Sequence, residues 1–286
     1  MSTTVKVIIG AAIALVAGIV ICGIAFAIGG KTNMGIGSTE YVTEVFEIED
    51  EFTNISVTAL TSDITIDRSD DGKCRVEFFQ PDYMELEAGV NNGTLEIEVN
   101  EDDPARLVFN IMSKTPTIKV YLPEEVYEDL SIDVTTGDII LGGISYGGSV
   151  DIKVTTGDIG IGNNVSDDLT YGDLNIEVNT GDIVIDNVGC QDLIYNVVTG
   201  DIQLQDVLAA DNINITGTTG DLTFDGCDAG RITVNLVTGD INGTLLTDKD
   251  FDAHTVTGDI DVPSSSEGGR CELTTTTGDI VIDIES

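Results

Sequence analysis

The tripeptide Thr-Gly-Asp occurs eight times in this chain, and its regular spacing constrains the fold more than any other feature. Its glycines are Gly137, Gly157, Gly181, Gly200, Gly220, Gly239, Gly258 and Gly278, so the spacings are 20, 24, 19, 20, 19, 19 and 20 residues. A period of about 20 residues is too short for helical-hairpin repeats and is typical of one coil of a β-solenoid. We therefore expect an all-β chain folded as a parallel β-helix, or solenoid, of about nine coils.

Positions counted from each of these glycines form columns of like residues. The residues seven and five positions before the glycine are apolar in all eight copies, and so are those two and four positions after it, except at Gly243. The residue four positions before the glycine is polar in every copy. This alternation predicts one strand entering the turn and one leaving it, with four apolar columns facing a shared core. A single coil cannot bury its apolar face alone, so the stacking of coils makes the core.

Each residue of the repeated tripeptide suits a tight turn. A glycine fixed at one place in every copy predicts a backbone position with φ > 0. Threonine is β-branched and suits the end of a strand, where its hydroxyl can bond to the next coil. The aspartate can accept hydrogen bonds from local backbone N–H groups. All three residues therefore have structural reasons to be there.

The aspartates of the repeat form a column of like charges, which stacked coils would place at about the 4.8 Å spacing of strands. The column consists of Asp138, Asp158, Asp182, Asp201, Asp221, Asp240, Asp259 and Asp279. One hypothesis is that Ca²⁺ or another hard cation bridges neighbouring carboxylates, since such ions bind carboxylate and carbonyl oxygens. The alternative is that each carboxylate caps its own turn, and the absence of the Ca²⁺-binding nonapeptide of other solenoids favours it. No other cofactor is expected.

The stretch before the repeats, residues 46–125, predicts an irregular β region that caps a solenoid of residues 126–286. Residues 54–57 and 62–66 indicate one degenerate coil, with Ser62-Asp63 where later copies have Gly-Asp. Asn92-Gly93, between two segments of alternating polarity, predicts a β-hairpin. A hairpin at the end of a solenoid shields an otherwise exposed sheet edge.

The N-terminal part of the chain predicts a membrane anchor. Residues 7–28 are an unbroken run of 22 apolar or small residues between Lys6 and Lys31, long enough to cross a hydrocarbon core of roughly 30 Å as a helix. We expect residues 1–30 to be a single-pass transmembrane anchor in the cell membrane, residues 31–45 a tether, and the domain beyond them extracytoplasmic. The competing hypothesis is a cleaved signal peptide, since Ala25-Phe26-Ala27 resembles a processing site.

The charge of the chain excludes one class of partner. Lysine and arginine number 12 against 51 aspartates and glutamates, for a formal net charge of −39. Nucleic acid binds proteins mainly through basic side chains that neutralise phosphates, so DNA and RNA are not expected as partners. A surface of this sign attracts cations, cationic peptides and basic protein patches.

Four cysteines follow the predicted anchor, and none is expected to form a disulfide. Cys271 stands in the apolar column seven before the glycine, and Cys227 stands seven after it, in a column with Ile144, Val188, Val207 and Leu246. Both are therefore predicted to be small buried hydrophobes. Cys190 lies about two coils from Cys227, beyond the reach of a disulfide.

From about residue 46 to residue 286 the chain resembles the bacterial DUF4097 family, whose members are labelled as adhesins. The resemblance rests on Lys119-Val120-Tyr121-Leu122-Pro123, on Leu130-Ser131-Ile132 and on the serial Gly-Asp-Ile copies. It implies a β-solenoid at the cell envelope, often with a membrane segment. It implies no catalytic residue that could be assigned here.

Together these observations predict a non-catalytic interaction, adhesion or scaffolding module on a membrane anchor, with an envelope protein or basic ligand as its partner. One alternative is a cation-binding structural spacer. Another is a glycan-active β-helix enzyme, which the absence of tryptophan makes a poor fit because sugar grooves use aromatic platforms. His254 is the only histidine, and its position predicts an outward side chain, so no Ser-His-Asp triad or two-histidine metal site can form within one chain.

Overall fold

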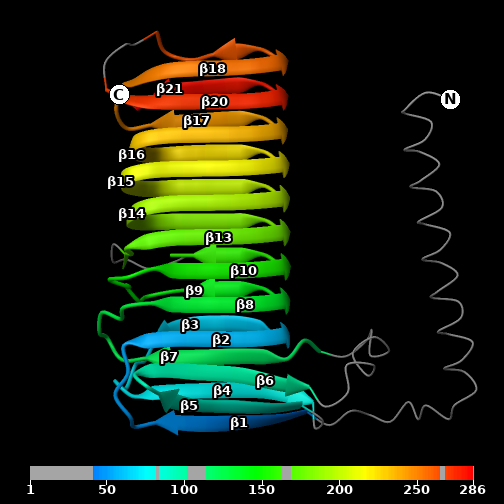
Figure 1. Ribbon diagram of the computed structural model, residues 1–286, viewed down its shortest axis with the longest axis vertical. Coiled ribbons are helices and arrows are strands. Elements are labelled where there is room, and N and C mark those ends of the chain that lie inside the picture. The colour runs from blue at the N-terminus through cyan, green and yellow to red at the C-terminus, as the bar shows by residue number, and fades with distance from the viewer. Residues whose placement is uncertain (1–40, 82–83, 102–113, 163–168, 265–267, 286) are drawn as a thin grey trace, which may run out of the picture. The chain divides into compact units, whose positions relative to one another are not determined.

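The computed structural model describes residues 41–81, 84–101, 114–162, 169–264 and 268–285, and they form one stack of β-strands (Figure 1). The predicted membrane segment, residues 7–28, and most of the predicted tether lie outside these ranges. Within them, no helix has the length and apolar character needed to cross a bilayer. The predicted all-β solenoid is confirmed, with parallel pairing along the whole length of the stack.

Strands on two faces of the stack meet at the Thr-Gly-Asp turn, which we call the Thr-Gly-Asp corner. The first face holds the strands that enter this corner. In spatial order they are β6 (Thr94–Glu101), β2 (Asn54–Thr61), β8 (Leu130–Thr136), β10 (Val150–Thr156), β13 (Asp173–Thr180), the later parts of β14 (Ile183–Thr199), β15 (Ile202–Thr219) and β16 (Leu222–Thr238), then β20 (Gly269–Thr277) and β18 (Lys249–Thr257).

The second face holds the strands that leave the corner. In the same order they are β7 (Thr117–Leu122), β3 (Asp63–Arg68), β9 (Ile139–Leu141), β11 (Ile159–Ile161), the early parts of β14, β15 and β16, then β17 (Ile241–Leu245), β21 (Ile280–Ile284) and β19 (Ile260–Asp261). The described strands therefore make ten layers where about nine coils were predicted. The added layer is β6 with β7, because both pair in parallel with the degenerate coil β2–β3.

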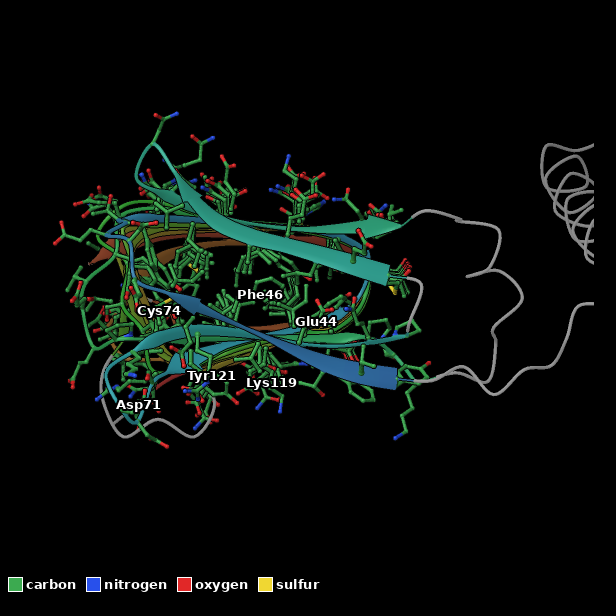
Figure 2. All side chains as sticks on the ribbon, turned by 90° about the horizontal axis from the view of Figure 1, so that it is seen from below. Glu44, Phe46, Asp71, Cys74, Lys119 and Tyr121 are labelled. Atoms are coloured by element: carbon green, nitrogen blue, oxygen red, sulfur yellow. The ribbon has the colours of Figure 1, made fainter. Side chains whose placement is uncertain are left out.

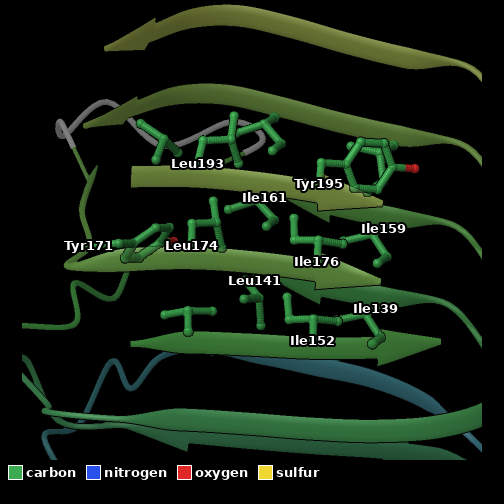
Figure 3. Packing of buried hydrophobic residues seen from close by; sticks show 14 of the residues in the cluster. Ile139, Leu141, Ile152, Ile159, Ile161, Tyr171, Leu174, Ile176, Leu193 and Tyr195 are labelled. Atoms are coloured by element: carbon green, nitrogen blue, oxygen red, sulfur yellow. The ribbon is translucent and has the colours of Figure 1, made fainter. Parts of the chain in front are cut away.

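The four predicted apolar columns form the core (Figure 3). In register, Ile152 lies beside Ile176 and Ile176 beside Tyr195, so each column runs continuously through successive coils. Residues of these columns are at most 3% exposed, except Phe251, Ala253, Ile260 and Val262 of one coil and Gly243. Each buried aliphatic side chain of this kind contributes about 1.5–3 kcal/mol relative to an exposed one. The alternation seen in the sequence therefore holds the coils together.

The order of layers departs from chain order at both ends of the stack. The strands β20 and β21 lie between β16–β17 and β18–β19, although β18–β19 precede them in the chain. At the other end β2–β3 lie between the β6–β7 layer and β8–β9. At both ends, therefore, coils that follow one another in the chain do not all lie next to one another in the stack. Every coil presents the same columns to its neighbours, so the stacking geometry itself does not fix their order.

Antiparallel strands cover the end of the stack that holds β6 and β7. There β4 (Cys74–Pro81) pairs antiparallel with β7 and with β1 (Tyr41–Ile48), while β5 (Met84–Asn91) forms a hairpin with β6. Seen along the stack, β1 crosses this end, with Phe46 near its middle (Figure 2). The predicted hairpin at Asn92-Gly93 is confirmed, because both residues have positive φ. It belongs to the layers outside β2–β3 rather than to the degenerate coil itself.

A second corner, the return corner, connects the two faces on the side away from Thr-Gly-Asp. Among the described residues, four coils have a residue of positive φ there, six positions after the repeat glycine: Gly143, Asn187, Asp206 and Gly226. This extra residue places the seventh residue, such as Val188 or Cys227, in the core. The coil of β17 has no such residue, so Leu245 rather than the predicted Leu246 pairs with Cys227. The prediction for Leu246 is therefore wrong: Leu245 is buried and Leu246 is exposed. The short strand β12 (Leu169–Thr170) pairs with β14 at this corner.

Candidate functional site

The glycines of the Thr-Gly-Asp corner stand where no side chain fits. Their φ values lie between +144° and +152°, which confirms the predicted positive φ. A Cβ built on Gly200 would lie 1.8 Å from the carbonyl oxygen of Gly181 in the neighbouring coil. The degenerate coil has Ser62 at this place, and no further Thr-Gly-Asp turn lies beneath it, since Asp63 N–H donates to the Pro116 carbonyl. The invariance of this glycine follows from the close approach of adjacent coils.

The aspartates of the corner form a ladder of hydrogen bonds, which we call the aspartate ladder. One carboxylate oxygen of each aspartate except Asp259 accepts a hydrogen bond from the backbone N–H of the aspartate in the adjacent coil, as between Asp201 Oδ1 and Asp221 N at 2.9 Å. The eight such distances run from 2.7 to 3.0 Å and join, in order, Asp63, Asp138, Asp158, Asp182, Asp201, Asp221, Asp240, Asp279 and Asp259. The expectation that each carboxylate caps its own turn is therefore corrected, because it caps the turn of its neighbour.

The two ends of the aspartate ladder differ. Asp63 begins it, and burial raises the pKa of its carboxyl, an effect that the hydrogen bond from Asp138 N–H opposes. Asp259 ends it: its N–H donates to the Asp279 carboxylate, and no backbone N–H of the described residues donates to the carboxylate of Asp259. The ladder is thus directional, and its last acceptor lies in the outermost coil.

The hydrogen bonds of the aspartate ladder account for an aspartate at each turn without a bound metal ion. Among the described residues, no three or more histidine, cysteine, aspartate or glutamate side chains form a group that could hold a metal ion. Binding of Ca²⁺ between adjacent carboxylates stays a prediction, with Asp138, Asp158, Asp182, Asp201, Asp221, Asp240, Asp259 and Asp279 as its ligands.

We expect the melting temperature of the protein to be the same, within about 1 °C, in EDTA and in millimolar CaCl₂. One oxygen of every ladder carboxylate except that of Asp259 already accepts a backbone N–H, so folding does not need a cation to neutralise an uncompensated row. The measurement is calorimetric unfolding, with NaCl of equal ionic strength as the control for general screening. A rise of several degrees with CaCl₂ alone, reversed by EDTA, would show that cations do bridge the carboxylates.

A buried ion pair links two layers near the return corner. The Lys249 ammonium of β18 contacts the Asp228 carboxylate of β16, although β20 lies between these strands. The side chain of Lys249 is 3% exposed and that of Asp228 is 23% exposed. Thr247 Oγ1 lies 2.7 Å from the ammonium and also donates to Asp228. No feature of the sequence distinguished this lysine from a surface residue.

The cysteines and the histidine considered in the sequence analysis have structural rather than chemical roles. Cys74, Cys190, Cys227 and Cys271 are all buried and unpaired, which confirms that none forms a disulfide. Burial raises the pKa of the Cys74 and Cys227 thiols to about 11 and that of the Cys190 and Cys271 thiols to about 12, so all four stay protonated at neutral pH. His254 is exposed on β18, as its position in the repeat predicted.

An aromatic column runs inside the return corner. The ring centroids of Phe52 and Tyr127 are 5.6 Å apart, those of Tyr127 and Tyr146 are 6.3 Å apart, and those of Tyr146 and Tyr171 are 5.7 Å apart. The buried hydroxyls of Tyr146 and Tyr171 have no hydrogen-bond partner within the described residues. Burial raises the pKa of both well above the ordinary tyrosine value. These rings therefore serve as core and carry no charge at neutral pH.

A pocket of about 770 Å³ opens near the return corner at the covered end of the stack. Its lining includes Glu47, Glu49, Asp50, Glu51 and Glu125, with Lys73 and the rings of Phe52 and Tyr127. Five carboxylates against one ammonium give it the same sign as the chain as a whole. It favours basic groups. The Cys74 thiol also lines it, and burial raises the pKa of this thiol to about 11, so it is protonated at neutral pH.

The opposite end of the stack is open. Within the described residues β18 pairs only with β20, and β19 only with β21. Phe251, Ala253 and Val262, which stand in core columns, are half-buried there, and Ile260 is 44% exposed. The sequence could not locate this end, because the outermost coil is not the last one in the chain.

These features define the class of protein as a parallel β-solenoid, closed at one end by antiparallel strands and, as far as the described residues go, open at the other. The chain belongs to the Toastrack DUF4097 family, whose model matches residues 52–286 and confirms the resemblance seen in the sequence. No curated protein matches it.

Solved structures with similarity to this chain include three bacterial proteins, and the first of them supports the same fold. A putative adhesin from Bacteroides fragilis is 17% identical, covers 87% of this chain and 98% of its own, and has a TM-score of 0.55. A putative lipid binding protein from Parabacteroides distasonis is 14% identical over 88% of this chain and 98% of its own, with a TM-score of 0.47. A putative adhesin from the same species is 13% identical over 86% and 98%, with a TM-score of 0.37.

Proposed function

We propose that this protein is a non-catalytic interaction module, acting in adhesion or scaffolding at the cell envelope, and that residues 7–28 hold it in the membrane with the solenoid outside the cytoplasm. The observation that carries this proposal is where the repeat carboxylates lie and what they bind. The repeat carboxylates lie on the outside of a stack whose interior is aliphatic, and the aspartate ladder uses them to order the corner. Membership in a family with adhesin-like structural relatives supports the same function.

The partner we propose is basic. The chain has a net charge of −39, and a surface potential of that sign draws cationic groups from solution and repels nucleic acid and anionic headgroups. Because the strands hold these charges at fixed spacing, a partner with a row of lysine or arginine gains several contacts at once.

The function is tested by affinity purification of the tagged full chain from detergent-solubilised membranes. We expect at least one envelope protein with a basic surface to be enriched at physiological salt and lost as ionic strength rises, since charge contacts between exposed groups are screened. The control bait carries the same tag and residues 1–45 alone. Equal recovery with both baits would contradict the proposal.

A structural spacer that projects or shields is the second candidate, and the aspartate ladder favours it because the carboxylates there already have a purpose within the fold. A spacer predicts that no protein is enriched over the control bait. The same purification therefore separates the two functions.

A further inference from the structure

The open end of the stack exposes the groups that every other layer uses to hold its neighbour. The residues of its core columns, Phe251, Ala253, Ile260 and Val262, are covered on one side only, since β18 rests on β20 and β19 on β21. At the covered end, β1, β4 and β5 close the corresponding surface. An edge strand left in this state is a ready template for another strand. Figure 1 shows β18 at this end of the stack.

The Thr-Gly-Asp corner of the outermost coil also holds three unused hydrogen-bonding groups in a fixed order. In the coil below, Gly278 N–H donates to the Thr257 carbonyl, Ile280 N–H donates to the Asp259 carbonyl, and the Asp279 carboxylate accepts Asp259 N–H. The same three bonds recur at each corner below. In the outermost coil the equivalent groups are Gly258 N–H, Ile260 N–H and the Asp259 carboxylate, for which the described residues supply no such partner. They form a donor, acceptor, donor set that matches the backbone of an incoming strand.

The negative charge around this end favours a partner strand with basic side chains. The described residues between 249 and 285 contain eight acidic side chains and two basic ones, Lys249 and Arg270. Lys249 is buried against Asp228, and Arg270 pairs with Asp250, Asp252 and Glu272. Asp259 and Asp261 stay exposed beside the edge. An extended segment with apolar side chains facing the core and lysine or arginine facing outward therefore complements both the columns and the charge.

We infer that β18 and β19 form a docking edge for an extended, basic, alternately apolar strand of a partner protein, which adds to the stack as one more layer. This rests on the proposed interaction function and specifies where the partner binds. A second copy of this chain does not suit the edge, because two such ends would bring the exposed carboxylates of Asp259 and Asp261 in each copy close together, where like charges repel. Main-chain bonds would supply affinity, and the half-buried columns would supply the register.

The test uses the full chain in detergent and a fluorescent nonapeptide of alternating valine and lysine, with binding followed by anisotropy at physiological salt. The matched variants are Ala253→Glu, at the half-buried position of the edge, and Ala210→Glu, at an exposed position midway along the stack. Both add one negative charge, so attraction alone predicts equal or tighter binding to each. Docking at the edge predicts that Ala253→Glu weakens binding at least about tenfold, whereas Ala210→Glu stays within about twofold.

Two further peptides separate strand addition from attraction of charge. A valine–glutamate nonapeptide is expected not to bind, and a valine–lysine peptide with two central prolines is expected to bind at least about tenfold more weakly, because proline cannot donate to the ladder. Equal binding of the proline peptide, or equal affinity of the two variants, would overturn the inference. So would self-association in light scattering that Ala253→Glu abolishes, since the occupant would then be a second copy.

Failure of this inference and failure of the proposed function give different results. If the membrane purification enriches a partner equally with wild-type and Ala253→Glu bait, the partner binds elsewhere, so the function stands and the docking edge is wrong. If neither bait enriches a protein over the control, the proposed function itself fails.

Discussion

Replacing Gly200 with alanine is expected to lower the free energy of unfolding by at least about 4 kcal/mol. The added Cβ would lie 1.8 Å from the Gly181 carbonyl oxygen, well inside any van der Waals contact, and the φ of +150° is itself unfavourable for alanine. Relief of the clash requires the coils to separate, which breaks the hydrogen bonds at this corner and exposes the columns beneath. Urea-induced unfolding followed by circular dichroism measures the loss.

Gly89→Ala is the matched control for this substitution. Gly89 lies in β5 without a positive φ, and its Cβ would meet nothing within 4 Å. Its unfolding free energy should change by no more than about 0.5 kcal/mol. If Gly200→Ala unfolded at the same urea concentration as Gly89→Ala, the close approach of coils at the corner would not be the reason for its glycine.

Converting Asp228 to asparagine is expected to cost about 3–5 kcal/mol of unfolding free energy. The amide keeps the shape and the acceptor oxygen of the carboxylate but leaves the Lys249 ammonium buried without a counter-charge. Lys249 is 3% exposed, so water cannot replace the lost partner. Urea unfolding gives the overall cost, and hydrogen exchange of the β18 amides locates it.

Two variants check the cause. Glu177→Gln breaks the Lys153–Glu177 pair, whose side chains are 59% and 60% exposed, and should cost no more than about 1 kcal/mol. Lys249→Met added to Asp228→Asn removes the buried charge and should recover most of the lost stability. If the double variant were as unstable as Asp228→Asn alone, packing rather than charge would explain the effect.

Much of the fold could be predicted because the same alternation of apolar and polar residues around a constant glycine recurs in every repeat. Columns through Ile152, Ile176 and Ile215 showed which residues are buried, and the constant glycine showed where φ is positive. The hairpin at Asn92-Gly93 followed from its turn residues. These features depend on local chemistry and on alternation, both of which one sequence contains.

The sequence could not predict which coils lie next to one another or which group of a neighbouring coil a side chain contacts. Val234 pairs with Leu273 rather than with Ala253 of the next repeat in the chain, yet either column residue would fit, so no pattern fixes the order of layers. An aspartate at a turn has several N–H groups in reach, so the sequence could not show that the carboxylate serves the adjacent coil. The sequence could not show the burial of Lys249 either, because its partner Asp228 lies two layers away, on the far side of β20.

The displaced layers at the two ends also bear on how the protein is made. A solenoid whose coils follow chain order can grow one coil at a time behind the ribosome. Here residues 249–261 leave the ribosome before residues 269–284, which form their native support. Strands β18 and β19 can therefore take their native place only together with β20 and β21, after both segments have been synthesised. At the other end, β2 and β3 likewise precede β6 and β7 in the chain, which complete the layer on one of their sides.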